Sequence, residues 1–252
     1  MEGDYEITVS GYDEGPYMLR ADFTDGTGVV PVALFAGDVV DGKVANFQLR
    51  YEEPIFHDDF SRSNGTDVGP DWVEVKGDWD LDGKRLHVSG LQDGGKGPAR
   101  QLWTASAFEA DRFIVKTQIV LQNGSDDAAG PLRRNDRAFL SFGADKGGRG
   151  GYRLVYSPFD GELELRSWNS TLAAASLAAG LDQALGIRLV RDGGNGLIEI
   201  FVDTGEGFPA QAQMVIFDAS SQILGRLGFG QKARSFGLYV DWVIVRPLPL
   251  QQ

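Results

Sequence analysis

The amino-acid sequence predicts an all-β protein, and three observations lead to this prediction. Glycine accounts for 34 of the 252 residues and aromatic residues for 11%, a mixture typical of short strands joined by tight turns. Many segments alternate apolar and polar side chains, which is the period of a half-buried strand. Turn-forming sequences such as "DGTG", "VDGK" and "LDGK" separate these segments. Hydrophobic residues make up 42% of the chain, which is enough for a real core.

Residues 1–52 are predicted to form a small β segment, with strands in "YEITVSG", "PYMLRADF", "GVVPVALFAG" and "KVANFQLRYEE". Pro31 indicates an edge strand or a bulge, because proline has no N–H to donate to a ladder. Four strands in so short a segment form a thin sheet, which is marginal unless it packs on something. The sequences "GPYMLRADF" and "GDVVDGKVANFQLRY" resemble the last strands of Ig-like or pre-peptidase-type modules of bacterial surface proteins.

The composition changes after this segment. Residues 56–72 read "FHDDFSRSNGTDVGPDW", an acidic stretch with Pro54 and Pro70 near its ends. We therefore place a domain boundary near Glu53, which gives domains at residues 1–52 and 53–252. Within the acidic stretch, Phe56 and Phe60 are expected to anchor the first strand of the second domain in its core.

Regularly spaced strands are expected throughout the second domain, and no interval demands a helix. The expected strands lie in residues 71–90 (two strands joined by "LDGK"), 100–106, 112–122, 137–145, 151–158, 161–168, 186–193, 197–205 and 236–248. Alanine and leucine in "TLAAASLAAGLDQALG" favour a helix by propensity. We favour a strand there, because it would pair with "GELELRSW" and continue the meander. In the last strand, alternation places Val240, Trp242 and Ile244 on one side, and Tyr239, Asp241, Val243 and Val245 on the other.

Several of these segments together resemble one superfamily. "DDFSR" with "KGDWDLDGKRL", "YRLVYSP", "IRLVRDGGNGLIEIFVDTG" and "FGLYVDWVIVRP" are similar to the concanavalin A-like lectin/glucanase superfamily, nearest to its laminin-G-like jelly rolls. The resemblance covers about residues 55–248. It implies a jelly-roll sandwich of two curved antiparallel sheets with one concave face. The expected fold is therefore a two-sheet antiparallel jelly-roll sandwich preceded by a small N-terminal β segment.

Composition excludes several kinds of function. Lys and Arg number 24 against 36 Asp and Glu, so the net charge is −12 and nucleic acid is a poor partner. The chain has no cysteine and two histidines, which removes thiol chemistry and leaves little for histidine-based catalysis. No stretch is apolar for long enough to span a membrane as a helix. No signal peptide is visible, so an exported protein would have lost it or would contain this chain as a fragment.

Paired carboxylates are the first candidate for chemistry, because the resembled superfamily includes glycoside hydrolases. Such enzymes place two acids on one strand face, where residues i and i+2 point the same way. The nearest match is "GELELRSW", in which Glu162 and Glu164 share a face. The central aspartate and the third acid of the hydrolase pattern are absent. A charged, solvated strand face explains the row as well.

The resemblance also implies one structural Ca²⁺, held by acidic side chains of the first strand and by the aspartate of a closing "V-D-aromatic-V-x-V" strand. The closing strand here reads "VDWVIV", which assigns Asp241, with Asp58 or Asp59 as its partner. Carboxylates are the hard oxygen ligands that Ca²⁺ prefers. The alternative is that Asp241 caps local backbone N–H groups while Asp58 and Asp59 face water.

Sugar binding would need exposed aromatic rings with polar neighbours. Most tryptophans of a β-sandwich lie in its core, and Trp79 and Trp242 are expected there. Trp103 and Trp168 are better candidates for the concave surface. Arg100 in "RQLW" and Arg166 in "RSW" could bind sugar hydroxyls or a carboxylate.

We therefore expect a non-catalytic glycan-binding or adhesion module of an exported or cell-surface protein, with a polysaccharide as its partner. The first alternative is a glycoside hydrolase that uses Glu162 and Glu164. The second alternative is a structural subunit of a surface filament, layer or virion. There, the small N-terminal sheet would pair with another domain or a neighbouring copy, since unpaired edges invite strand addition.

Overall fold

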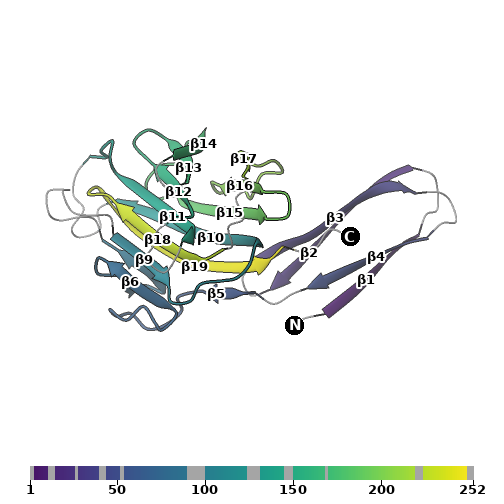
Figure 1. The fold of residues 1–252 in the computed structure, drawn as a ribbon, viewed down its shortest axis with the longest axis horizontal. Coiled ribbons are helices and arrows are strands. Elements are labelled where there is room, and N and C mark those ends of the chain that lie inside the picture. The colour runs from purple at the N-terminus through teal and green to yellow at the C-terminus, as the bar shows by residue number, and fades with distance from the viewer. Residues whose placement is uncertain are drawn as a thin grey trace. The chain divides into compact units, whose positions relative to one another are not determined.

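The computed structural model describes residues 3–10, 15–25, 28–39, 44–51, 54–89, 100–123, 131–144, 150–167, 170–218 and 224–248. All regular structure in these residues is β-strand, which confirms the all-β prediction. The chain divides into two compact units, Met1–Pro54 with Pro249–Gln252, and Ile55–Leu248 (Figure 1). Among the described residues, none forms a helix with the length and apolar character needed to cross a membrane.

The first unit contains the four predicted strands, β1 (Gly3–Ser10), β2 (Gly15–Asp25), β3 (Gly28–Val39) and β4 (Val44–Tyr51). They pair as two separate two-stranded sheets, β1 with β4 and β2 with β3, and not as the single thin sheet we expected. The register of β2 and β3 shifts between Ala21 and Asp22, opposite Pro31. Val32 is the extra residue of this bulge and Pro31, paired with Asp22, lies next to it, so the bulge that Pro31 indicated is confirmed one residue further along the chain.

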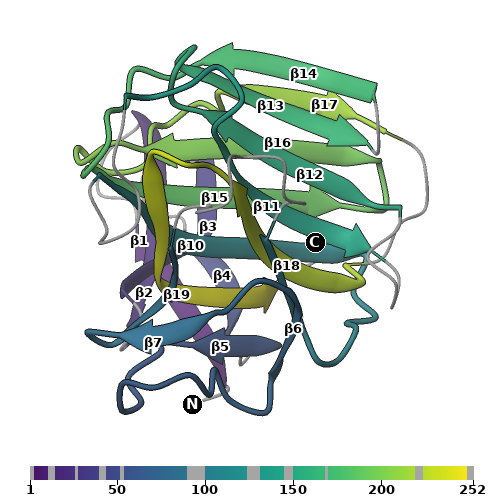
Figure 2. The same ribbon diagram turned by 90° about the vertical axis from the view of Figure 1, so that its left-hand side faces the viewer.

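The second unit is a sandwich of two antiparallel sheets, which confirms the jelly-roll prediction (Figures 1 and 2). Its strands are β5 (Phe56–Asp58), β6 (Trp72–Lys76), β7 (Asp80–Asp82), β8 (Arg85–Val88), β9 (Arg100–Thr104), β10 (Arg112–Asn123), β11 (Arg137–Ala144), β12 (Tyr152–Ser157), β13 (Glu162–Ser167), β14 (Ser170–Ser176), β15 (Ala184–Asp192), β16 (Leu197–Asp203), β17 (Met214–Phe217), β18 (Arg226–Lys232) and β19 (Phe236–Pro247). The eight-stranded sheet has the order β17-β16-β15-β10-β19-β8-β7, with β5 beside β19. The seven-stranded sheet has the order β14-β13-β12-β11-β18-β9-β6.

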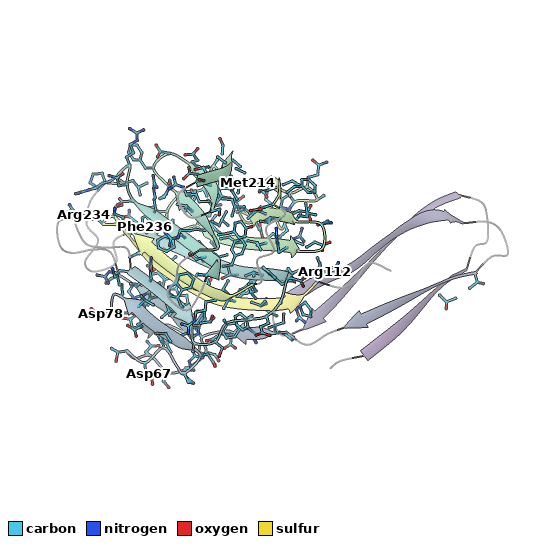
Figure 3. The ribbon with its side chains drawn as sticks, in the orientation of Figure 1. Asp67, Asp78, Arg112, Met214, Arg234 and Phe236 are labelled. Carbon is cyan, nitrogen blue, oxygen red and sulfur yellow. The ribbon has the colours of Figure 1, made fainter. Side chains whose placement is uncertain are left out.

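The core lies between these two sheets, and alternation along each strand supplies it. Leu102, Leu140 and Leu165 of the seven-stranded sheet are at most 2% exposed. Side chains of the eight-stranded sheet, including Met214 and Phe236, belong to the same core cluster (Figure 3). Each large apolar side chain buried in this way contributes about 1.5–3 kcal/mol, so the opposing inner faces hold the sandwich together.

The first part of the alanine-rich segment is a strand, as predicted, whereas residues 177–183 form a connection to β15. Strand β14 pairs with β13 along its length, and its alternate alanines pack against the core. Alanine favours a helix on its own, but a neighbouring strand with an open edge gives the segment a ladder and a buried face. Tertiary pairing therefore decides its structure.

Three strands were not predicted. One strand was expected before the "LDGK" turn, but the chain forms two there, β6 and β7, which belong to different sheets. Of the other two, β18 is the more important. Its sequence "RLGFGQK" contains Gly228 and Gly230, and glycine is depleted in strands. The strand nevertheless lies between β11 and β9 in the middle of the seven-stranded sheet. The other missed strand, β17, is a four-residue edge strand beside β16.

The closing strand β19 departs from the alternation that we predicted. Its register against β10 shifts between Gln118 and Ile119, which leaves Asp241 as the extra residue of a β-bulge. Val240 and Val243 therefore both face the core and are fully buried, while Trp242 is half-buried on the outer face opposite Gln118. The predicted grouping of Val240 with Trp242, and the core position of Trp242, are wrong because the bulge exchanges the two faces.

Tyr156 of β12 joins this strand to the segment that follows β14. Its hydroxyl donates a hydrogen bond to the Ala179 carbonyl, and burial raises the pKa of the phenol. Because the unfolded pKa is about 10, the stability linked to this group is complete below pH 10 and is lost as the pH rises through the folded pKa. We expect Tyr156→Phe to lose less unfolding free energy than the natural chain between about pH 9.5 and 11.5. Denaturant unfolding over this pH range measures the difference, and equal losses in the two proteins would contradict it.

Candidate functional site

One row of side chains crosses the outer face of the seven-stranded sheet. We define the outer face as the strand positions that point away from the core, namely Val73, Lys76, Gln101, Trp103, Arg137, Phe139, Ser141, Arg153, Val155, Ser157, Glu162, Glu164, Arg166, Thr171, Ala174, Ser176, Arg226, Gly228, Gly230 and Lys232. Directly opposed residues share a face, and the register runs from Trp103 through Gly228, Ser141 and Arg153 to Arg166. Five consecutive strands thus bring residues that are far apart in sequence into one line.

The two glycines of β18 form the floor of this face. A Cβ atom at Gly228 would lie 2.5 Å from the Trp103 ring, and one at Gly230 would lie 2.2 Å from the Phe139 ring. The two rings therefore lie directly against the β18 backbone, in space that any other residue would fill. Both rings are nearly covered, with 3% of Trp103 and 7% of Phe139 exposed.

Arg153 is the central cation of the outer face. Its guanidinium carbon lies 4.5 Å from the centroid of the Phe139 ring, and its Nε–H donates to Ser141 Oγ at 3.3 Å. Burial lowers the pKa of Arg153, and the nearby charge of Arg166 lowers it further. Both effects oppose the charged form. The fold therefore holds a cation in a place where the surrounding residues make its charge unfavourable.

The predicted acidic row lies on this face. Arg166 forms an ion pair with Glu164 at 2.7 Å, and the Thr171 hydroxyl donates to the other Glu164 oxygen at 3.3 Å. Glu162 is exposed at the start of β13. The two glutamates point the same way, as expected for positions i and i+2, but both oxygens of Glu164 already have partners. Catalysis by this row stays a prediction.

The predicted ligand-binding residues are only partly brought together. Arg166 and Trp103 both point outward, but Trp103 is buried, so its predicted exposure is wrong. Arg100 lies three residues before Trp103 and therefore faces the opposite way, beside Gln231 and packed over Gly77. Trp168 lies outside the described residues.

Asp58, a predicted Ca²⁺ ligand, is the centre of a buried hydrogen-bond network. Its carboxylate accepts two N–H bonds from Arg62, both at 2.9 Å, and one from the Trp72 indole at 2.7 Å. The backbone N–H of Phe60 donates to it as well, at 2.9 Å. Four donors occupy both oxygens, and the guanidinium supplies the positive charge that a metal ion would bring. Hydrogen bonding to Asp58 also raises the pKa of Arg62.

The other two predicted Ca²⁺ ligands have different surroundings. Asp241 accepts a hydrogen bond from Gln118 at 2.7 Å and lies 3.9 Å from Arg85, on the outside of the eight-stranded sheet. Asp59 is exposed and accepts a local bond from the Ser61 backbone N–H, which lowers the pKa of Asp59. No group of three or more His, Cys, Asp or Glu side chains in the described ranges is placed to share a metal ion. These residues do not fit the predicted shared Ca²⁺ site.

Phe139, Ser141 and Arg153 were not recognised from the sequence. A signal existed, because "YRLVYS" places one arginine among the apolar residues of a strand. That signal shows which way Arg153 points relative to its own neighbours, but it does not show which residues of other strands lie beside it. Cross-strand register supplies this information.

Comparison with solved structures places the fold among lectin-like sandwiches. No family model matches the chain, and no curated protein matches it. A chain described as "Prominent members of the human gut microbiota express endo-acting O-glycanases to initiate mucin breakdown" has a TM-score of 0.58 and 12% identity, covering 78% of this chain and 100% of its own. A Bacillus subtilis protein with a galectin-like fold has a TM-score of 0.56 and 14% identity, covering 80% and 98%. The VIP36 exoplasmic/lumenal domain in its Ca²⁺/Man3GlcNAc-bound form has a TM-score of 0.55 and 10% identity, covering 73% and 86%. Identities this low show the fold alone.

Proposed function

We propose that this chain is a non-catalytic glycan-binding module of an exported or cell-surface protein, and that the outer face of the seven-stranded sheet is its binding surface. The observation that carries the proposal is the row in which Ser141, Arg153 and Arg166 lie side by side. The rings of Trp103 and Phe139, which lie against the β18 backbone, are next to this row. Guanidinium groups can donate hydrogen bonds to sugar hydroxyls. The rings of Trp103 and Phe139 are nearly covered, and that of Phe139 supports Arg153 from beneath, so neither ring itself stacks on a sugar. The similarly folded VIP36 domain in its Man3GlcNAc-bound form supports the proposal.

Glycoside hydrolysis is the competing proposal. A general acid or nucleophile must be free to reach the scissile bond, with two carboxyl groups about 5–9.5 Å apart. Glu164 is held instead by Arg166 and Thr171, so the contacts favour a structural role for it in arranging Arg166. Binding without bond cleavage is the function that these contacts support better.

A polysaccharide array probed with the intact chain tests the proposal. We expect the chain to bind at least one glycan of the array. Prolonged incubation of the chain with that glycan should release no reducing ends. The variant Glu164→Gln should then show the same absence of release as the natural chain. Release that this variant loses would replace the binding function with a hydrolase. An array without any bound glycan would remove the proposed function altogether.

A further inference from the structure

The outer face carries a positive charge although the chain as a whole is strongly acidic. Its strand positions hold six cations against two carboxylates, Glu162 and Glu164, whereas the chain has a net charge of −12. The six cations are Lys76, Arg137, Arg153, Arg166, Arg226 and Lys232. At physiological ionic strength charges more than about 8 Å apart are largely screened, so a ligand on this face responds to these nearby cations and not to the net charge.

Like charges face each other twice on this surface. Arg153 lies directly opposite Arg166, and Arg137 lies directly opposite Lys232. Directly opposed like charges destabilise a sheet. Arg166 is compensated by Glu164, but Arg137, Arg153 and Lys232 form no ion pair with any residue in the described part of the chain. No ion pair among the described residues therefore offsets the repulsion between these cations.

We propose that this face binds an acidic polysaccharide, one that bears carboxylate or sulfate groups, with Arg153 as the central contact. This inference rests on the proposed glycan binding and names its ligand class. A guanidinium matches the two oxygens of a carboxylate or sulfate with paired N–H donors. Arg137 lies four residues along β11 from Ser141, the partner of Arg153, which is about 14 Å for an extended strand. Two cationic pairs at this separation suit a polymer with repeated anionic groups better than a single small anion.

A single-stranded nucleic acid is also a polyanion, and the contacts argue against it. Binding single strands relies on exposed aromatic rings on which bases stack. On this face Trp103 and Phe139 are nearly covered, and the guanidinium of Arg153 lies over the Phe139 ring. The cations are therefore available while the rings are not.

The experiment uses the intact chain and its Arg153→Gln and Arg137→Gln variants. The matched control is Lys84→Gln, which removes one exposed cation from the β7–β8 turn of the opposite sheet. Each protein is titrated against three sets of array glycans, namely neutral, uronate- or sialate-bearing, and sulfated, and against a single-stranded oligonucleotide. We expect preference for one anionic set and a 10- to 100-fold loss of affinity in Arg153→Gln, because each hydrogen bond to a charged group contributes strongly to binding. Arg137→Gln should lose less, and Lys84→Gln should bind like the natural chain.

The outcomes separate this inference from the proposed function. Preference for the uronate or the sulfated set identifies the source of the anion. Equal binding of neutral glycans by the natural chain and Arg153→Gln would overturn the acidic-ligand inference and leave glycan binding intact. Tighter binding of the oligonucleotide than of every glycan would overturn both, and so would binding to none of the probes.

Thermal unfolding of the same variants distinguishes a binding residue from a structural one. Burial and the opposed Arg166 disfavour the charge of Arg153, and this offsets the loss of its contacts with Phe139 and Ser141, so Arg153→Gln should unfold at a temperature close to that of the natural chain. A marked fall in its unfolding temperature together with lost binding would show that Arg153 maintains the sheet, and would overturn its role as the central contact.

Discussion

Replacing Asp58 by alanine is expected to lower the unfolding free energy of the Ile55–Leu248 unit by about 3 kcal/mol, because buried donors lose their acceptor. The Trp72 indole N–H and the Phe60 backbone N–H both bond to Asp58, and both residues are at most 5% exposed. Each such unsatisfied donor costs about 1–3 kcal/mol. Arg62 adds less to the loss, because its side chain is 40% exposed and can turn to water. For a unit of this size the melting temperature should fall by roughly 6–12 °C.

The neighbouring residue provides the control. Asp59 is exposed and makes one local hydrogen bond, so Asp59→Ala should change the unfolding free energy by no more than about 0.5 kcal/mol. Calorimetry of the two variants, each with Ca²⁺ and with EDTA, separates a hydrogen-bond centre from a metal site. If Asp58 and Asp59 shared an ion, EDTA would lower the melting temperature of the natural chain, and each substitution would lower the melting temperature by a similar amount in the presence of Ca²⁺. Such a result would contradict the assignment of Asp58 to Arg62, Trp72 and Phe60.

Replacing Gly230 by alanine is expected to destabilise the same unit by about 2 kcal/mol through overpacking. The added methyl carbon would lie 2.2 Å from the Phe139 ring and 2.5 Å from the Arg100 carbonyl oxygen. The ring can rotate away, but the carbonyl belongs to the neighbouring strand β9 and cannot move without disturbing the ladder. Denaturant unfolding should therefore show a lower midpoint with an unchanged slope, since the native surface stays the same.

Two further proteins make this measurement specific. Gly65→Ala adds the same methyl group where no heavy atom lies within 4 Å, so its stability should change little. The double variant Gly230→Ala/Phe139→Ala removes the ring but leaves the Arg100 carbonyl. We expect the double variant to lose less unfolding free energy than the sum of the losses of Gly230→Ala and Phe139→Ala, because the clash with the ring is absent from it. If Gly230→Ala is as stable as Gly65→Ala, the close packing of β18 described above is incorrect.

The fold could be predicted from the sequence because its determinants are local. Apolar alternation in "RFIVKTQIVLQ", turn residues such as Gly83 and Lys84, and the first and last strands each indicate a strand or a hairpin without knowledge of distant residues. Gly83 and Lys84 both have positive φ, at 57° and 63°, as a tight two-residue hairpin between β7 and β8 requires. The concentration of such signals over about two hundred residues is what predicts a sandwich.

The site could be predicted only in part, because it depends on how strands are aligned with one another. Glu164 was found because it lies two residues from Glu162 on one strand, and Arg166 because it lies two residues from Trp168. Arg153 needs the register of β12 against both β11 and β13 before its neighbours are known. One bulged residue, Asp241, was enough to exchange the faces of the closing strand and to separate this aspartate from Asp58. Strand β18 was not predicted because it contains two glycines. These same glycines allow the rings of Trp103 and Phe139 to lie against its backbone.

The pairing of β5 with β19 has a consequence for how force reaches this sandwich. The Ile55 N–H donates to the Val245 carbonyl at 2.8 Å, and the two strands run antiparallel, so the polypeptide arrives and departs at the same point. A force that pulls Ile55 and Val245 apart acts on the few hydrogen bonds between β5 and β19. Because the two strands are antiparallel, these bonds break one after another. The interleaved strands behind them are not sheared together. Tension along the chain therefore acts first on the pairing of β5 with β19, and only afterwards on the core of the sandwich.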